Sequence, residues 1–405
     1  MKKVTLDMIK EAKSTIKDIV KETPLIESVK MSEKTGANIY LKCENLQKTG
    51  SFKIRGACNK ISNLTQEEKE KGVIASSAGN HAQGVALGAK MNGIKATIVM
   101  PSTAPLAKVT ATKGYGAEVV LNGLVYDDAY AKAVELQKET GATFLHPFND
   151  EYVIAGQGTI SLEILEQLEN VDTIVCPIGG GGIIAGVATA AKAIKPSIKI
   201  VGVQTANIPS TKASFEKGEV TSAFKDVTIA DGIAVKTPGD LTFSIVKELV
   251  DEVVVVEEDE IAQAMLFLLE NQKVTAEGAG AVSTAAIWSD KYIPKKGENV
   301  VCIISGGNVD INTLYRVIDK GLVKCGRRYT FKTHIVDKPG GLGEMTRILT
   351  DLNANILNAN MSKLSSKYGL GHQAVEMTIE TFDEDHKRRI KENLTNAGFY
   401  ITDLE

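Results

Sequence analysis

A lysine with unusual neighbours is the residue of this chain that most directly suggests chemistry. Lys53 follows Gly50, Ser51 and Phe52, which permit a tight turn and place an aromatic ring beside the amine in the sequence. The residues at 54–61 are typical of a helix, so Lys53 is expected where a loop meets a helix. A lysine packed against apolar surface loses affinity for its proton and becomes a usable nucleophile. The alternative is a solvated surface residue, as most lysines are.

A run of four glycines is the second feature, and it lies between a predicted buried strand at 173–178 and a predicted helix at 183–194. The run consists of Gly179, Gly180, Gly181 and Gly182. Backbone N–H groups in such a loop can surround an anion, with the positive end of the helix behind them. No Gly-Lys-Ser/Thr follows, which excludes a Walker A loop, and the next strand ends in Gln204 where a dinucleotide site needs an acid. A phosphate monoester is therefore favoured over NAD; a turn without a ligand is the alternative.

One cofactor requires both features, because pyridoxal phosphate carries an aldehyde for an amine and a phosphate for the glycines. Ser305 ends the predicted strand at 300–304, where a hydroxyl could face a pyridine nitrogen. A serine is a neutral partner for that nitrogen, unlike an aspartate, and it suits β-elimination. A plain turn residue is the alternative for Ser305.

Further candidates follow the predicted strand at 72–76 and open the next helix. Ligands gather at the carboxyl ends of parallel strands, so the N–H groups of this segment could hold a substrate carboxylate. Asn80 could hydrogen-bond a phenolic oxygen, whereas His81 is more often a packing residue than a catalyst. Glu277 precedes a helix and is either a helix-terminal charge or a site carboxylate. The carboxylate candidates are Ser77, Ala78, Gly79, Asn80 and His81.

Composition narrows the class of protein. Of 405 residues, 43% are hydrophobic and 24% charged, and the net charge of −3 gives no nucleic-acid footprint. No stretch of about 18 apolar residues predicts a membrane span, and the N-terminus does not resemble a signal peptide, so a cytoplasmic protein is expected. The five cysteines and five histidines are scattered without metal-ligand spacing. We therefore expect buried free thiols and no metal site.

The order of predicted elements indicates an α/β protein with a separate C-terminal domain. Strands alternate with helices from residue 72 onward, which predicts doubly wound parallel sheets. We expect a catalytic domain at 1–320, with a smaller subdomain at roughly 42–145, and a link at 321–328. The residues at 329–405 read as βαββαβ, the ferredoxin-like order, with a hairpin turn at 365–369.

Five motifs in this order carry a resemblance to a known family. The segments at 51–57, 77–84, 179–182, 230–235 and 305–308 resemble those of the threonine ammonia-lyases (threonine dehydratases), in the tryptophan synthase β-like group of pyridoxal phosphate enzymes. The resemblance covers roughly residues 5–320 and implies two doubly wound parallel-sheet domains. The C-terminal part resembles a single ACT domain, an amino-acid-sensing module.

The resemblance assigns roles to the candidate residues. It implies that Lys53 is the Schiff-base lysine, that Phe52 lies beside the ring, and that Asn80 is the partner of the ring hydroxyl. The four glycines become the phosphate loop, Ser305 the partner of the pyridine nitrogen, and the segment from Ser77 to His81 the substrate-carboxylate loop. Gly232 and Glu277 are further possible site residues. The implied ligand loop of the ACT-like domain contains Asp337, Pro339, Gly340, Gly341 and Leu342.

One position separates this chain from the related serine racemases. They carry a second serine where this chain has Ala78, and that serine is the acid/base on the opposite face of the cofactor. They also have acidic metal ligands near the stretch after Gln204, which here is the uncharged segment at 205–209. The resemblance therefore does not extend to racemisation or to that metal site.

The resemblance implies an L-threonine ammonia-lyase that forms 2-oxobutanoate and ammonia, with L-serine as an expected second substrate giving pyruvate. A small-molecule effector acting through the ACT-like domain, a homo-oligomer (dimer or tetramer), and a place in isoleucine biosynthesis or threonine catabolism are implied with it. Two alternatives stay open. One is a serine dehydratase or racemase, and the other is a non-catalytic amino-acid sensor with an inert front domain.

Overall fold

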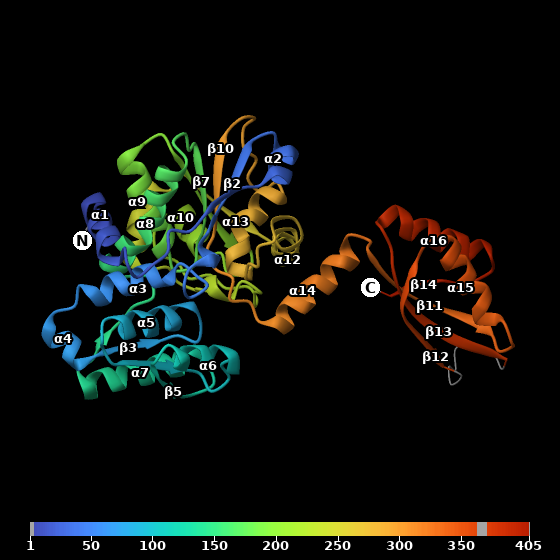
Figure 1. Cartoon of the computed structure of the whole chain (residues 1–405), viewed down its shortest axis with the longest axis horizontal. Helices are drawn as coiled ribbons and strands as arrows, with labels where there is room; N and C mark the ends of the chain where they lie inside the picture. Colours follow the sequence, from blue (N-terminus) through green and yellow to red (C-terminus); the bar gives the residue numbers. More distant parts are fainter. Residues whose placement is uncertain (1–3, 363–370, 405) are drawn as a thin grey trace. The chain divides into compact units, whose positions relative to one another are not determined.

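The computed structural model describes residues 4–362 and 371–404. The chain divides into two compact units, Met1–Asp310 and Ile311–Glu405 (Figure 1). The sequence suggested a link at 321–328, but the helix α14 spans Ile311–Lys324 and belongs to the second unit. The residues that we expected to be irregular are therefore in part the end of a helix.

The larger sheet of the first unit has six strands in the order β1-β2-β10-β7-β8-β9. All neighbours pair in parallel except β1, which is an antiparallel edge strand. Strands β7 and β10 are buried almost throughout, as expected for parallel strands covered on both faces. The strands are β1 (Leu25–Glu27), β2 (Asn38–Cys43), β7 (Thr173–Pro177), β8 (Lys199–Thr205), β9 (Glu252–Val256) and β10 (Asn299–Ile304).

Helices cover this sheet on both faces (Figure 1). Residues of α8, α9 and α11 form one core cluster with the strands, and α13 packs on β7, β8, β9 and β10. The apolar side chains of these helices are buried because each helix packs one face against the sheet or a neighbouring helix. The helices of this layer are α1 (Leu6–Ile16), α2 (Val29–Thr35), α8 (Glu151–Gln167), α9 (Gly182–Ile194), α10 (Ser210–Lys217), α11 (Asp240–Leu249), α12 (Glu258–Phe267) and α13 (Gly278–Trp288).

A smaller parallel sheet, β5-β4-β3-β6, forms the inserted subdomain. Its core joins α3 and α5 to the strands, and α3 also packs on α8 of the larger layer. The strands are β3 (Val73–Ser76), β4 (Ala96–Met100), β5 (Glu118–Leu121) and β6 (Thr143–Phe144). The helices are α3 (Lys53–Ser62), α4 (Gln66–Lys71), α5 (Asn80–Met91), α6 (Leu106–Gly114) and α7 (Tyr126–Thr140). The expectation of doubly wound parallel sheets is confirmed.

The sequence pattern predicts a helix at 158–168, but α8 begins earlier, at Glu151. Asp150 caps it, because its carboxylate accepts the N–H groups of Tyr152 and Val153 at 2.9 and 3.1 Å. Gly156 and Gly158 have low intrinsic helix propensity. In the structure both lie inside α8, at its closest approaches to neighbouring helices.

The second unit has the predicted βαββαβ order after α14. Its antiparallel sheet has the order β12-β13-β11-β14, and buried residues alternate along β11 and β13. These inward side chains and those of α15 and α16 form a separate core. The expected turn at 365–369 lies outside the described residues. The elements are β11 (Arg328–Val336), α15 (Gly341–Asp351), β12 (Asn355–Ser362), β13 (His372–Glu380), α16 (Glu384–Asn396) and β14 (Thr402–Leu404).

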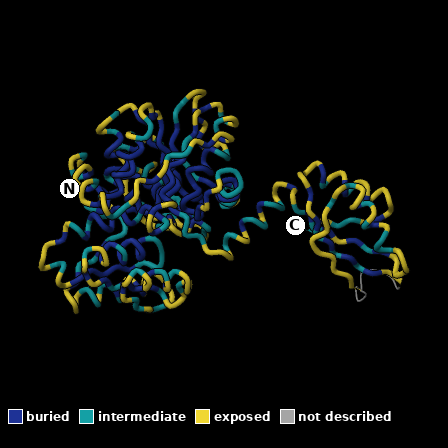
Figure 2. The backbone as a smooth tube through the Cα atoms, in the orientation of Figure 1, coloured by how far each residue is buried: buried dark blue, intermediate teal, exposed yellow. Residues whose placement is uncertain are grey.

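Burial follows this layered plan, and most residues of β2, β7, β8 and β10 in the larger sheet are buried (dark blue in Figure 2). Four cysteines are buried free thiols, as expected, but Cys325 is exposed because it lies just beyond the end of α14. Within the described ranges, no helix is long and apolar enough to cross a membrane. The same residues contain no cluster of three or more His, Cys, Asp or Glu side chains with metal-site geometry.

Candidate active site

Lys53 is the first residue of α3, and the loop before that helix is tied to the end of β10. The N–H of Phe52 donates to the carbonyl of Ser305 at 3.0 Å, and Ser51 forms a bridge with Gly306. The Lys53 amine donates to the carbonyl of Pro147 at 3.0 Å and lies 5.2 Å from the centre of the Phe52 ring. The structure therefore places Lys53 at the predicted junction of loop and helix.

The environment of Lys53 favours a neutral amine. Burial lowers the pKa of its amine from 10.5 to about 8, although the Glu277 carboxylate opposes this shift. The same burial, together with the charge of Lys53, lowers the pKa of His146 to about 4. Near neutral pH a substantial fraction of Lys53 can thus act as a nucleophile or as a base.

The glycine run forms a tight cradle between β7 and the first turn of α9. Gly181 has φ +93°, a left-handed conformation that glycine adopts without strain, and α9 begins at Gly182. A Cβ on Gly182 would lie 2.9 Å from Phe148, so the loop packs closely on that residue. The first turn of α9 contains no acidic side chain. Its N–H groups have no acceptor within the helix, which makes this loop suited to an anion.

Thr242 holds the glycine loop from the side, and sequence reasoning did not identify it. Its hydroxyl donates to the carbonyl of Gly180 at 2.6 Å, and its own N–H lies 3.3 Å from the Asn149 side-chain oxygen. Asn149 follows Phe148 directly in the sequence. No local signal marks either residue, because both act across more than 60 positions of the chain.

Asn80, Glu277 and Asn308 form a hydrogen-bonded row beside the cavity. The Asn80 amide donates to Glu277 Oε1 at 2.6 Å and accepts from the Asn308 amide at 2.8 Å, which fixes its orientation. Glu277 is only 5% exposed. Burial, and then the charge of Asp231, raise the pKa of Glu277 to about 7, although the Asn80 hydrogen bond lowers it. Glu277 therefore titrates near neutral pH.

The predicted carboxylate loop lies at the N-terminus of α5. The Gly79 N–H donates to the hydroxyl of Ser77 at 3.2 Å, and α5 begins at Asn80. His81 has a structural contact, since its Nε2 is 2.8 Å from the carbonyl of Leu145. Burial, together with Lys53, lowers the pKa of His81 to about 3, so it remains neutral as a packing residue.

Ser305 and Gly232 complete the set of predicted residues. The Ser305 hydroxyl donates to the carbonyl of Ala279 at 3.3 Å at the end of β10. Gly232 lies in a short 3₁₀ turn, Asp231–Ile233, and a Cβ there would be 3.0 Å from Ala279 and 3.4 Å from Glu277. A side chain at residue 232 would crowd the carboxylate that contacts Asn80.

One cavity of about 800 Å³ brings these residues together. This volume is within the usual range for small-molecule sites. Lys108 and Asp231, which sequence reasoning did not single out as site residues, both line it and form an ion pair of 2.9 Å between α6 and the 3₁₀ turn. The predicted site residues in its wall are Phe52, Lys53, Ser77, Ala78, Gly79, Asn80, His81, Gly179, Gly180, Gly181, Gly182, Gly232, Glu277 and Ser305.

The predicted effector loop lies in the second unit. Gly340 has φ +91° and precedes α15, and Gly341 is the first residue of that helix. The Asp337 carboxylate accepts a hydrogen bond from the Gln373 amide, and the Asp337 N–H donates to Gly371 at 2.8 Å. The loop thus presents a helix N-terminus at the end of β11.

Pyridoxal phosphate fits the residues of the cavity. It needs an amine of lowered pKa, an anion cradle free of acidic side chains and room for an amino acid beside it, and the cavity offers all three. The fold and the site therefore define an enzyme that acts on small molecules with pyridoxal phosphate chemistry.

Comparison with known proteins places the chain more closely. The model of the pyridoxal-phosphate-dependent enzymes matches residues 16–306, and the chain belongs to this family, whose cofactor it uses. It is 52% identical over 398 residues to the L-threonine ammonia-lyase of Thermotoga maritima, covering 98% of this chain and 99% of that one.

Two solved structures are similar to the chain. Maize serine racemase has 42% identity and a TM-score of 0.75, covering 79% of this chain and 98% of that chain. The processed form of threonine deaminase isoform 2 from Solanum lycopersicum has 41% identity and a TM-score of 0.74, covering 77% and 87%.

Proposed function

We propose that this protein is an L-threonine ammonia-lyase that converts L-threonine to 2-oxobutanoate and ammonia. The observation that carries the proposal is one cavity shared by the Lys53 amine, the glycine cradle and the carboxylate loop. The similarity over nearly the full length of the Thermotoga enzyme supports the same reaction. L-serine, which lacks one methyl group, is the expected second substrate, because a single methyl changes binding by only about 1–3 kcal/mol.

Several residues of the cavity would hold the cofactor. The N–H groups from Gly179 to Gly182 would hold its phosphate, and Phe52 would lie beside its ring. Asn80 would hydrogen-bond its phenolic oxygen, and Ser305 would face its pyridine nitrogen. When bound, the cofactor supplies an aldehyde that takes up the substrate amine and a ring that draws electrons from the α-carbon.

The protein's own residues then orient the amino acid and move one proton. The N–H groups at the start of α5 hold the substrate carboxylate. Lys53, as a neutral amine, takes the proton from Cα, and the environment that lowers its pKa makes this possible near neutral pH. The β-hydroxyl leaves as water with one added proton, which balances the proton that Lys53 took from Cα, and the resulting enamine hydrolyses to the keto acid and ammonia.

Racemisation is the competing reaction, because maize serine racemase has a similar fold. It needs a proton donor on the face of the substrate opposite Lys53. Ala78 lines the cavity in the carboxylate loop and has no such group, while the neighbouring Ser77 hydroxyl accepts the Gly79 N–H. Elimination is therefore favoured over racemisation at this site.

The direct test is an assay of the purified holoenzyme with L-threonine and L-serine. We expect 2-oxobutanoate and pyruvate, measured by reduction with lactate dehydrogenase, and chiral chromatography should show no D-amino acid. Appreciable D-serine would favour the racemase alternative. Bound cofactor without keto acid from either substrate would favour the non-catalytic sensor.

We also propose that the second unit is regulatory. The loop from Asp337 to Leu342 offers close backbone approach at two glycines and free N–H groups at the start of α15, which suits the carboxylate of an amino-acid effector. A cytoplasmic homo-oligomer, as a dimer or tetramer, completes the proposal. A change in threonine kinetics with isoleucine or valine would support it, and indifference to a panel of amino acids and nucleotides would not.

A further inference from the structure

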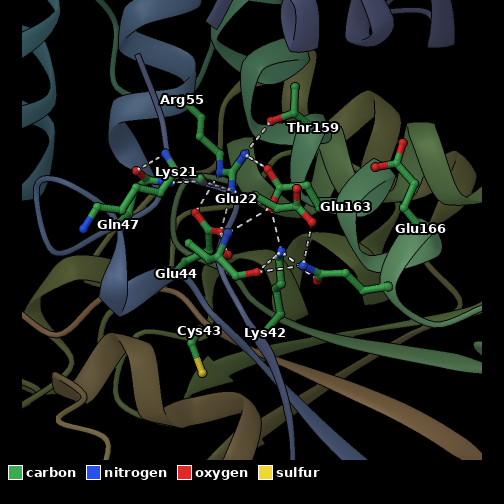
Figure 3. Close-up of polar contacts among 12 residues, drawn as sticks. Lys21, Glu22, Lys42, Cys43, Glu44, Gln47, Arg55, Thr159, Glu163 and Glu166 are labelled. Carbon is green, nitrogen blue, oxygen red and sulfur yellow. Dashed lines mark hydrogen bonds and ion pairs between the residues drawn. The ribbon is translucent and has the colours of Figure 1, made fainter. Parts of the chain in front are cut away.

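Four charged side chains, one of which lies on the helix that begins with Lys53, form a buried cluster (Figure 3). Arg55, Lys42 and Glu44 have no exposed surface, and Glu163 is 5% exposed. Two positive and two negative charges balance within the cluster. Burying charged side chains costs desolvation energy, and their pairing and hydrogen bonds often only offset that cost. Stability alone therefore does not explain why the protein buries four of them.

Arg55 is the centre of the cluster, and each of the two carboxylates accepts two hydrogen bonds from its guanidinium. Glu44 accepts from its Nε and Nη2, each at 2.8 Å. Glu163 accepts from Nη1 at 2.6 Å and from Nη2 at 2.9 Å, and Thr159 accepts from Nη1 at 3.1 Å. Such paired contacts on a planar guanidinium fix its direction as well as its position.

These contacts join three parts of the fold. Arg55 is the third residue of α3, Glu44 follows β2 of the larger sheet, and Glu163 lies on α8. Helix α3 has no side-chain cap at its N-terminus. Its first turn, which begins with Lys53, is therefore held by the Arg55 clamp and by the loop contacts at Phe52.

Helix α8 also fixes the helix of the anion cradle. Glycines let α3 and α8 touch, since a Cβ on Gly156 would lie 2.6 Å from the Arg55 carbonyl. Glycines likewise let α8 and α9 touch, since a Cβ on Gly158 would lie 2.9 Å from the Gly186 carbonyl. One helix thus sets the place of both Lys53 and the glycine loop.

We propose that Arg55 is a positioning residue, which acts through Lys53 by holding the first turn of α3 against α8 at a fixed distance from the glycine cradle. The reaction needs the amine and the phosphate site at one separation, that of the two ends of the cofactor. The threonine reaction in this argument rests on the proposed function, but the positioning of Lys53 does not.

Lys42 provides a matched control. Its amine donates to Glu163 at 2.6 Å, to the carbonyl of Thr23 at 2.7 Å and to Gln167 at 3.0 Å. It is as buried as Arg55 and pairs with the same carboxylate, but it lies on β2 and has no hydrogen bond to α3. Lys42→Met therefore removes one buried cation without releasing the helix.

The first measurement follows Lys53 itself in the full-length chain after its cofactor has been removed. Trace acetylation at several pH values, read by mass spectrometry, gives the pKa of the Lys53 amine. We expect Arg55→Met to raise it from about 8 toward its ordinary value by about one unit or more, because a released amine reaches water. Arg55→Lys keeps the charge but not the two-sided grip, so it should shift the pKa in the same direction by less.

The second measurement is binding of pyridoxal phosphate and, in the holoenzyme, kcat and KM for L-threonine. Both Arg55 variants should bind the cofactor at least about tenfold more weakly and lose kcat with little change in KM. Lys42→Met should lower the thermal midpoint as Arg55→Met does, yet leave the Lys53 pKa and cofactor binding near wild type.

The proposal fails if Lys42→Met and Arg55→Met shift the Lys53 pKa equally, or if the Arg55 variants leave it unchanged. If Arg55→Met does not fold, Arg55→Lys decides the matter by the same criterion. A protein that does not turn over threonine but shows the expected pattern of acetylation would refute the proposed function and leave this inference standing.

Discussion

Replacing Lys53 tests the chemistry most directly. Lys53→Ala removes the amine that both anchors the cofactor and takes the α-proton, so we expect turnover of L-threonine to fall below detection. Lys60→Ala is the matched control, because Lys60 lies on the same helix but pairs with Asp150 at 2.8 Å outside the cavity. It should retain turnover.

The expected loss of turnover in Lys53→Ala depends on how reactive the environment makes the amine. With a pKa of about 8, roughly a quarter of the Lys53 amine is neutral at pH 7.5, whereas an ordinary lysine is neutral about once in a thousand molecules. Burial thus raises the reactive fraction roughly 200-fold. A positioned general base of this kind contributes a factor of about 10² to 10⁴, so Lys53→Ala should lose at least about two orders of magnitude in turnover from this role alone.

Rescue by a small amine distinguishes loss of chemistry from loss of structure. Methylamine added to Lys53→Ala should restore part of the turnover, measured as keto acid formed with time. The rescued rate should keep rising with pH toward about 10, the pKa of a free amine, whereas wild-type kcat should level off near pH 8. Near-wild-type activity of Lys53→Ala without amine, or rescue that is insensitive to pH, would refute the reasoning.

Three further predictions concern other parts of the molecule. Ala78→Ser should introduce slow racemisation of L-serine, seen by chiral chromatography, while the wild type shows none. Truncation after Asp310, where the first unit ends, should leave threonine turnover and remove the response to effectors. Burial raises the folded-state pKa of Glu277 from 4.5 to about 7, so its contribution to stability is full below pH 4.5 and is lost as pH rises through 7. As the pH rises from 4.5 to 7, the thermal midpoint of the wild type should therefore fall relative to that of Glu277→Gln. The difference should correspond to about 3 kcal/mol of unfolding free energy.

The fold was largely readable from the sequence where local patterns were strong. The sequence pattern predicts strands at 96–100 and 118–121, and these coincide with β4 and β5, because β-branched and apolar runs there end at clear boundaries. Helix α8 was placed too late because its glycines serve contacts between helices, which propensity does not register. Strand β9 and helix α11 had no counterpart among the expectations, although both pack against the site-bearing sheet or its helices.

The site was readable only in part, and for a physical reason. Lys53, the glycine run and Ser305 stand at strand or helix ends, where spacing alone suggests a ligand. Thr242 and Lys108 have no such signal, since their roles depend on contacts across long stretches of sequence. The buried cluster around Arg55 is invisible for the same reason: Glu44 and Glu163 are 119 positions apart and meet only in the folded protein.

The N-termini of α3 and α9 explain why the amine and the anion cradle belong to different helices. The positive end of α9 attracts an anion to the glycine loop. Lys53 occupies the first position of α3, where the positive end of that helix disfavours an ammonium and acts in the same direction as burial. A single helix end could not do both, because a bound phosphate would stabilise the ammonium beside it. Keeping the two ends apart at a distance set by α8 preserves an anion site and a neutral amine within one cavity.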